Sequence, residues 1–395
     1  GMLEPDPLAA ELLVENVAQF GVLLLRASGM AGKEDGAERL HPDHIEKGFA
    51  LIQARIDKYN STTAEPFTEE PLASSGLASA GSVQQTFFTD MTEYAGINYM
   101  HRSSDWLNRL IRSYAMKSEN VGQLTIPPAF GGSGVAAEDI NQDGFSDFLI
   151  LGGVGNKLYL NNGKGGFIDI TSEAGLGWRR EDGTAGEARQ PIIADFDNDG
   201  KQDIFITYVD DDHRLYRNIG GNRFKDVTKH AGLGGKGLVG GPAVVFDFDN
   251  DGLLDIYISY FGDYIHGILP TLARYNVNGL PNKLFKNKGN MKFEDVTKGS
   301  GVDNTGWGQA ASHTDLDNDG LQDLIVGNDF GVNAYYRNKG DGTFEDISQT
   351  IGTSKPSYTM NVGISDLNSD QFPDIYISNI VTMNKDEKYV SPSED

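Results

Sequence analysis

Asp195-Phe196-Asp197-Asn198-Asp199-Gly200-Lys201-Gln202-Asp203 is the stretch from which the fold of this 395-residue chain can be inferred. It places carboxylates at its first, third, fifth and ninth positions and a glycine at its sixth. Carboxylates with this spacing can converge on Ca²⁺, which takes six to eight oxygen ligands, and the glycine permits the sharp turn. The apolar run that follows, Ile204-Phe205-Ile206, is rich in β-formers. The stretch therefore predicts a metal loop between two strands, whereas an EF-hand would need a Glu in twelfth place and flanking helices.

The pattern occurs five times, and its first Asp recurs at intervals of 56, 52, 68 and 51 residues. Eighteen of the 38 Asp residues fall in these loops, so the acidic charge has a specific use. The expected Ca²⁺ ligands are Asp139, Asn141, Asp143 and Asp147; Asp195, Asp197, Asp199 and Asp203; Asp247, Asp249, Asp251 and Asp255; Asp315, Asp317, Asp319 and Asp323; and Asp366, Asn368, Asp370 and Asp374. The fifth loop has Gln371 in place of glycine, so four Ca²⁺ sites are expected and the fifth is left open.

A second pattern follows each of the first four loops. An aromatic segment ending in Asn leads through a glycine turn to a Phe-x-Asp segment, as in Leu215–Asn218 and Phe224–Asp226. One unit therefore contains four short strands in about 50 residues, which is typical of a propeller blade. We expect an all-β propeller with at least five blade units, and a total of five to seven.

Residues 86–92 repeat the outer-strand pattern without a blade of their own, while the last loop has no outer strand after it. The two deficits predict that residues 86–92 complete the last blade and close the ring. The alternative is that further blades would follow residue 395.

The segment Phe130-Gly131-Gly132-Ser133-Gly134 ahead of the first loop resembles an FG-GAP repeat, as in the calcium-binding blades of integrin α-chains. The units of the type Phe224–Leu233 resemble the VCBS/FG-GAP proteins of the cartilage acidic protein-like, ASPIC/UnbV-associated group. The resemblance covers roughly residues 86–395. It implies the propeller fold and the calcium loops, and a mostly extracellular group with little known of its function.

Residues 1–85 lack the repeat and are expected to form a separate segment, with the propeller at 86–395. Helices are predicted at residues 8–27 and 42–59, followed by a linker at 61–85. We favour a helical hairpin packed on the propeller over a module that docks a partner. A further helix is predicted at Ser104–Met116.

The composition excludes several classes of protein. A formal net charge of −24 argues against nucleic acid or an anionic membrane as partner. The absence of Cys excludes disulfides, thiolate zinc sites and cysteine nucleophiles, and no stretch approaches the ~20 apolar residues of a membrane span. Because weak calcium sites fill only outside cells, we expect a secreted, periplasmic or cell-surface protein.

No catalytic motif is present in the sequence, so we expect a binding or adhesion module for a glycan or an extracellular protein, with structural calcium and no enzymatic activity. Aromatic and basic residues on two long loops and near the channel are the candidate ligand contacts. These are Trp178, Arg179, Tyr260, Tyr264, His266, Trp307 and His313. The alternatives are a polysaccharide lyase or hydrolase using His313, and a scaffold that docks a partner through the N-terminal helices. The ligand and the oligomeric state stay open.

Overall fold

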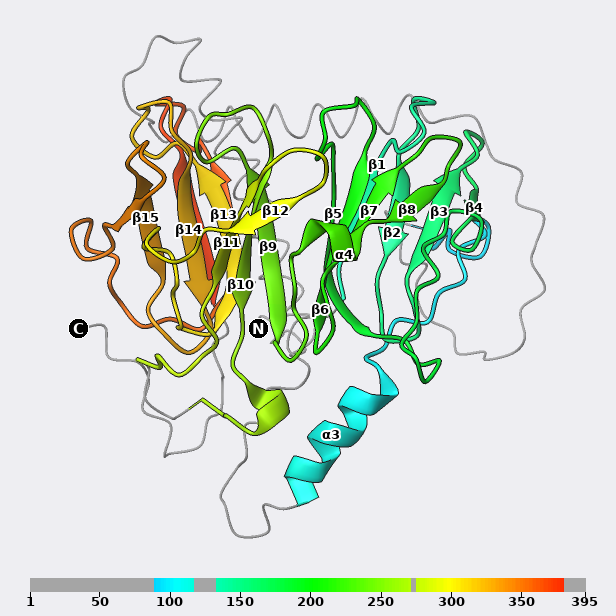
Figure 1. Cartoon of the computed structure of the whole chain (residues 1–395), viewed down its shortest axis with the longest axis horizontal. Helices are drawn as coiled ribbons and strands as arrows, with labels where there is room; N and C mark the ends of the chain where they lie inside the picture. Colours follow the sequence, from blue (N-terminus) through cyan, green and yellow to red (C-terminus); the bar gives the residue numbers. More distant parts are fainter. Residues whose placement is uncertain (1–88, 117–132, 271–274, 380–395) are drawn as a thin grey trace, which may run out of the picture. The chain divides into compact units, whose positions relative to one another are not determined.

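The computed structural model describes residues 89–116, 133–270 and 275–379 (Figure 1). These residues belong to one compact unit, Thr86–Asp395. The predicted helices at 8–27 and 42–59, the linker at 61–85 and the first part of the segment 86–92 lie outside the described residues.

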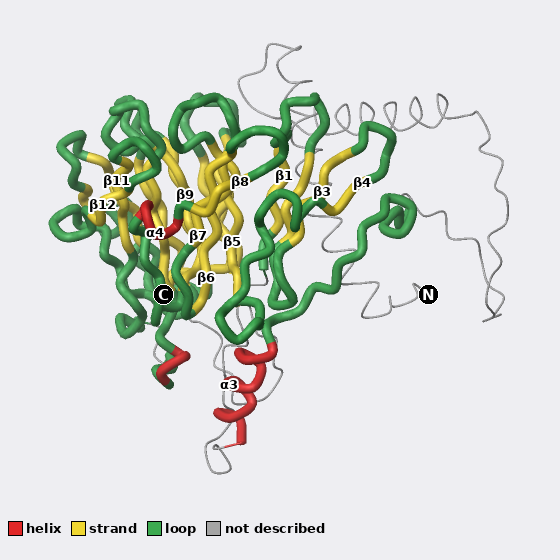
Figure 2. Tube along the Cα trace, turned by 45° about the vertical axis from the view of Figure 1, so that its right-hand side comes forward, coloured by secondary structure: helices red, strands yellow, loops and turns green. Residues whose placement is uncertain are grey.

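Four antiparallel sheets of four strands follow one another along the chain, each a simple meander. Figure 1 shows them side by side in chain order, and Figure 2 shows the strands joined by loops at both ends. The strands of the first two sheets are β1 (Val135–Glu138), β2 (Asp147–Ile150), β3 (Lys157–Asn161), β4 (Phe167–Asp169), β5 (Glu187–Ala194), β6 (Asp203–Val209), β7 (Arg214–Asn218) and β8 (Phe224–Asp226). The next two comprise β9 (Gly240–Phe246), β10 (Asp255–Tyr260), β11 (Lys283–Asn287), β12 (Phe293–Asp295), β13 (Gly308–Thr314), β14 (Asp323–Asn328), β15 (Ala334–Asn338) and β16 (Phe344–Asp346). The predicted four-stranded unit is confirmed in these four blades.

A fifth sheet contains β17 (Thr359–Ser365) and β18 (Asp374–Asn379). The first strands of all five sheets line a common cavity of about 540 Å³. Residues from each of these strands, or directly before them, contribute to it, among them Val135, Arg189, Gly241, Ala310 and Asn361. Sheets whose first strands share a central channel form a propeller, so the predicted fold class is confirmed.

Apolar residues of the second and third strands fill the spaces between neighbouring blades. Every residue of β6, β10 and β14 is buried, because each of these strands is covered on both faces. The interface between the second and third blades, for example, contains Phe205, Leu215, Ile256 and Phe285. These β-branched and aromatic runs suit a strand that is buried on both sides.

The predicted ring closure is not settled by the described residues. Asp90 forms the same turn that follows the outer strands of the blades. Its carboxylate accepts a hydrogen bond from the backbone N–H of Thr92, two residues further on. Ala95 then accepts a hydrogen bond from Phe167 of the first blade, as Ala174 does from Phe224 of the second. In the described part of the chain β18 pairs with β17 alone, so the pairing of residues 86–92 with the last blade stays a prediction.

The predicted helix at Ser104–Met116 is confirmed as α3 (Asp105–Met116). Its residue Leu107 is fully buried against Phe261, Tyr264 and Trp307. Two short helices, α4 (Thr228–Ala231) and η1 (Tyr264–His266), complete the described elements. No helix in the described ranges is long and apolar enough to cross a membrane.

Candidate metal centre

Each Asp-rich loop is held in shape by its own first carboxylate. In the second loop Asp195 accepts hydrogen bonds from the backbone N–H groups of Asp199 (3.1 Å) and Gly200 (2.8 Å). Gly200 has a φ of 82°, and Asn198 before it has a φ of 55°. Glycine and asparagine tolerate this left-handed conformation better than other residues, which explains their places in the repeat. The expected turn at the sixth position is therefore observed.

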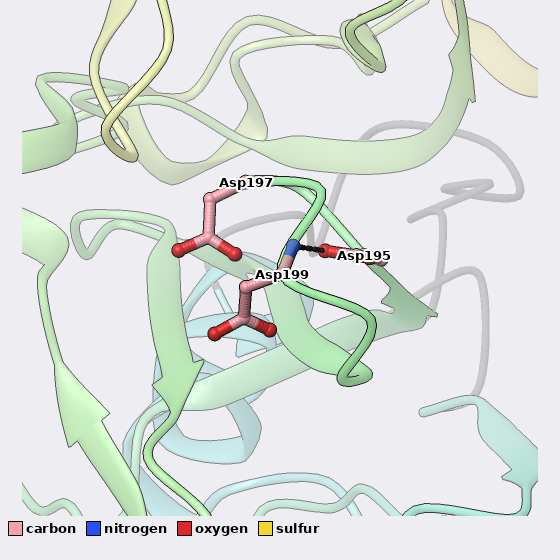
Figure 3. Close-up of side chains that lie close together, drawn as sticks. All are labelled: Asp195, Asp197 and Asp199. Atoms are coloured by element: carbon pink, nitrogen blue, oxygen red, sulfur yellow. Dashed lines mark hydrogen bonds between the residues drawn. The ribbon is translucent and has the colours of Figure 1, made fainter.

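Carboxylate oxygens converge in three of the five loops. Groups of three acidic side chains lie with one oxygen of each within 4.8 Å of the others. The groups are Asp195, Asp197 and Asp199; Asp247, Asp249 and Asp251; and Asp315, Asp317 and Asp323. Figure 3 shows the carboxylates of Asp197 and Asp199 on the same side of the second loop. Repulsion between such close anions makes a cation at this point favourable.

Two of these carboxylates also have unsatisfied oxygens. Oδ1 of Asp197 and Oδ1 of Asp249 are buried and have no hydrogen-bond partner, and the Asp197 side chain is only 8% exposed. The Oδ2 atoms of these carboxylates are paired with Arg217 and Lys286, but a buried oxygen without a partner of its own is costly. The residues therefore fit a hard cation that prefers oxygen ligands, such as Ca²⁺, which would supply the missing partner.

The ninth-position Asp residues have a structural task that the spacing did not predict. Asp255 is fully buried, and its two oxygens accept hydrogen bonds from the backbone N–H groups of Phe248 (3.1 Å) and Asn287 (2.7 Å). Burial raises the pKa of Asp255 to about 7 and that of Asp203 to about 6. These carboxylates tie the loop to the third strand. An additional role as metal ligand stays a prediction, although Asp323 lies within 4.8 Å of its acidic neighbours.

The first and fifth loops differ from the other three. Their third-position amides, Asn141 and Asn368, donate to the fifth-position carboxylates of Asp143 (2.9 Å) and Asp370 (3.0 Å). An oxygen at this position would have to replace the donating nitrogen before a metal could bind. In the fifth loop Gln371 adopts a φ of 76° in place of a glycine, a strained conformation for this residue type. These two loops are the poorer candidates.

Asparagine side chains connect the second and third loops to the next blade. Asn287 at the end of β11 donates to the carbonyl oxygen of Phe196 (2.9 Å), and Asn338 at the end of β15 donates to that of Phe248 (2.7 Å). Phe196 and Phe248 are the second residues of the preceding blades' loops. The sequence pattern contained these Asn residues, but their partners lie about 90 residues away and no local signal identifies them.

The candidate ligand contacts do not gather into one site. Tyr260, Tyr264 and Trp307 are buried, because the long connection after β10 folds onto the propeller with its aromatic side chains inward. The Trp307 indole N–H donates to Asn278 (2.8 Å), and the Tyr260 hydroxyl contacts His213 (2.8 Å). These three side chains form core rather than an exposed surface.

The remaining four candidates are at least partly accessible. Trp178 lies between the ring of Tyr208 and the guanidinium of Arg214. Arg179 is exposed and donates to Val154, and His266 is exposed beside Asp263. His313 stacks on Phe246 of the neighbouring blade and its Nδ1 lies 2.7 Å from Gln322 Oε1.

Comparison with known proteins agrees with this architecture. The model of the FG-GAP-like repeat matches residues 139–206, 195–258 and 315–377, which contain the loops and the strands that flank them. These residues thus contain FG-GAP-like repeats, and the fold around them is a β-propeller.

Its curated relatives are forms of one protein. Cartilage acidic protein 1 of Xenopus tropicalis is 25% identical over 322 residues, which are 74% of this chain and 46% of the relative. The protein of the same name from Homo sapiens is 29% identical over 203 residues, or 50% of this chain and 28% of the relative. This chain therefore spans less than half the length of the curated relatives it matches.

Two solved structures show more distant similarity. One is an Agrocybe aegerita lectin described as recognising non-reducing terminal N-acetylglucosamine, with a TM-score of 0.41, 22% identity and coverage of 62% of this chain and 60% of the lectin. The other is the Photorhabdus luminescens Tc holotoxin pore, with a TM-score of 0.32, 17% identity and coverage of 62% and 11%. At these scores neither structure bears on the function of this chain.

Proposed function

We propose that this protein is an extracellular binding module in which Ca²⁺ in the Asp-rich loops stabilises the propeller. The observation that carries this proposal is the convergence of carboxylates in the second, third and fourth loops. The buried, unpartnered oxygens of Asp197 and Asp249 support a metal in two of them. Asp residues used only as turn formers would direct their free oxygens to water.

The position of the loops supports a structural role for the metal. The second residue of a loop is bonded both to the ninth Asp of its own blade and to an Asn of the next blade, as Phe196 is to Asp203 and Asn287. A cation that rigidifies the loop would therefore stabilise the interface between two blades. Its binding energy would add directly to the free energy of unfolding.

The extracellular location rests on calcium supply and on the relatives. Module-type sites with Kd values of about 10⁻⁴–10⁻³ M fill outside cells and stay empty in cytosol. The relatives carry the name cartilage acidic protein 1, which suits a protein of the extracellular matrix. The partner would be a glycan or another extracellular protein.

The contacts of His313 favour a binding module over the alternative of a polysaccharide-cleaving enzyme. Its ring is stacked on Phe246 and its Nδ1 is bonded to Gln322. These contacts hold the ring in the interface between two blades, which is a structural position. The other alternative, docking through the N-terminal helices, concerns residues outside the described ranges.

The first test is thermal unfolding in EDTA and in millimolar Ca²⁺. We expect Ca²⁺ to raise the Tm, since one site at 100 times its Kd adds about 2.7 kcal/mol. Asp197→Asn should reduce this increase. Asp212→Asn makes the same change at an exposed residue outside the loops and should retain the full increase. An unchanged Tm on adding Ca²⁺ would refute structural calcium, and a glycan array read in both buffers would then separate glycan from protein partners.

A further inference from the structure

The third strand of each four-stranded blade carries one residue next to the Asp-rich loop, and this residue differs between blades. It is Leu160 on β3, Arg217 on β7, Lys286 on β11 and Arg337 on β15. We propose that Arg217 and Lys286 are built-in counter-ions that occupy the second and third loops and compete there with Ca²⁺. The charge on the neighbouring outer strand decides whether such a cation turns toward its loop. This inference rests on the calcium binding proposed above.

The cations of the second and third blades lie in the loops. Arg217 Nε is 2.6 Å from Asp197 Oδ2, and its NH2 is 3.3 Å from Asp199 Oδ2. The ammonium group of Lys286 contacts Asp249 and lies 3.1 Å from Asp251 Oδ2. Both cations thus use carboxylates at the third and fifth positions, which are the positions that a metal needs.

The fourth blade has the same loop but a cation that points elsewhere. The second, third and fourth loops share the pattern Asp-x-Asp-Asn-Asp-Gly-x-x-Asp. Arg337, however, places its NH2 2.6 Å from Glu345 Oε2 on the outer strand, and no ion pair joins it to a described carboxylate of its loop. Asp317 is accordingly exposed, whereas the Asp197 side chain is only 8% exposed under Arg217.

The register of the third and outer strands explains this difference. Arg337 lies directly opposite Glu345, whereas Arg217 lies directly opposite Lys225. Residues opposite one another in an antiparallel pair project from the same face, where opposite charges attract and like charges repel. Glu345 therefore draws its arginine away from the fourth loop, and Lys225 drives its arginine toward the second.

In the third blade the opposed carboxylate is already paired with another lysine, and in the first blade the third strand has no cation at this position. Lys286 lies opposite Glu294, but Glu294 pairs with Lys288 (3.4 Å), so the Lys286 ammonium is left for the loop. In the first blade Leu160 lies opposite Ile168, and its loop has no cation on the third strand.

Competition follows from charge. A divalent cation cannot share the same carboxylates with a guanidinium or ammonium group at contact distance without strong repulsion. Metal binding must therefore displace Arg217, which borders an open groove of about 740 Å³ and has solvent to move into. The displacement reduces the apparent affinity of the second and third loops. Because the fourth loop has the same residues at its ligand positions and no such ion pair, it should bind Ca²⁺ at the lowest concentration.

The test follows each loop separately during a Ca²⁺ titration of the full chain. Gly200, Gly252 and Gly320 occupy the sixth positions of the three loops, so ¹⁵N-glycine labelling and NMR give one amide signal for each. We expect the Gly320 signal to reach its midpoint at the lowest Ca²⁺ concentration. Lys225→Glu should lower the midpoint of Gly200 about fivefold, the equivalent of ~1 kcal/mol, and leave Gly320 unchanged. Glu345→Lys should raise the midpoint of Gly320 by a similar factor.

A charge control and the possible outcomes complete the design. Lys298→Glu makes the same charge change as Lys225→Glu at an exposed residue of the third blade and should leave the Gly200 midpoint where it was. If all three loops titrate together and neither exchange moves a midpoint, the counter-ion inference is wrong while calcium binding stands. If no glycine signal responds to millimolar Ca²⁺, the proposed function itself fails.

Discussion

The side-chain amide of Asn287 donates a hydrogen bond of 2.9 Å to the backbone carbonyl of Phe196, which belongs to the preceding blade. The same amide donates to Leu254 (3.0 Å), and the Asn287 backbone N–H donates to Asp255 (2.7 Å). One fully buried residue thus joins the loop of its own blade to the loop of its neighbour. The strength of the propeller depends on such joints between blades as well as on the apolar interfaces.

Asn287→Ala should lower the free energy of unfolding by about 2–4 kcal/mol, because it removes the donor from the buried carbonyl of Phe196 and from the partly buried carbonyl of Leu254. Chemical denaturation in EDTA would measure this without a contribution from metal. Asn161 is the matched control, since it holds the same position on β3 but, among the described residues, its side-chain amide donates only to Ser146 of its own blade. Asn161→Ala should cost clearly less, and equal losses for the two variants would contradict the role of the contact between blades.

The Asp residues of one loop should separate into structural and metal-binding groups. Asp323 is buried and accepts hydrogen bonds from the backbone N–H groups of Leu316 (2.8 Å) and Asn338 (2.7 Å). Asp323→Asn would place an NH₂ group against one of these backbone N–H donors. The variant should therefore be destabilised in EDTA by about 2 kcal/mol.

Asp317 of the same loop is exposed and belongs to the acidic cluster, where it contributes a negative charge. Asp317→Asn should therefore leave the Tm in EDTA nearly unchanged and reduce the increase caused by Ca²⁺. Thermal unfolding of both variants in both buffers is the measurement. A loss of Tm in EDTA for Asp317→Asn as large as that for Asp323→Asn would refute the division.

The local features of the fold could be predicted from the sequence, and the contacts between distant segments could not. The loop that ends at Asp203 and the strand after it were readable because the repeat confines ligand spacing, turn glycine and β-formers to about a dozen residues. The helix at Asp105–Met116 was readable from its amphipathic spacing. Each of these signals is local.

The burial of Trp307 illustrates the other kind of feature. The long connection after Tyr260 looked like an exposed aromatic loop, but its residues pack against Trp307 and Leu107, which come from other parts of the chain. Likewise, the direction of Arg217 and Arg337 depends on strand register. Once the strands are aligned, the opposed residues can be read from the sequence, but their effect on the loops requires the structure.

Stability should decrease in acid through His213. The backbone N–H of Tyr208 donates to His213 Nδ1 (3.1 Å), so the proton is on Nε2, which lies 2.8 Å from the Tyr260 hydroxyl. Burial, with a contribution from the Lys283 charge, lowers the pKa of His213 to about 3. The unfolded chain takes up a proton below pH 6.5 and the folded chain does not, so the neutral ring's contribution is complete above pH 6.5 and is lost as the pH falls toward 3.

Between pH 7 and pH 5 this linkage amounts to about 2 kcal/mol. Denaturation of the wild type and of His213→Gln at several pH values would measure it as the difference between the two curves. Parallel curves for the wild type and His213→Gln would show that the buried imidazole does not cause the acid sensitivity.

Gly262 should be indispensable because the Trp307 ring occupies the space of its missing side chain. A Cβ added at Gly262 would lie 2.0 Å from a carbon of that ring, which is fully buried against Phe261 and Phe330. Gly262→Ala should therefore cost about 3 kcal/mol through overpacking. Gly177→Ala is the control, since nothing lies within 4 Å of its Cβ position.

The double variant Gly262→Ala, Trp307→Phe should regain part of the lost stability, because the smaller ring makes room for the methyl group. If the double variant is only as stable as the sum of the single losses predicts, the two positions are independent and the contact does not anchor the connection after β10.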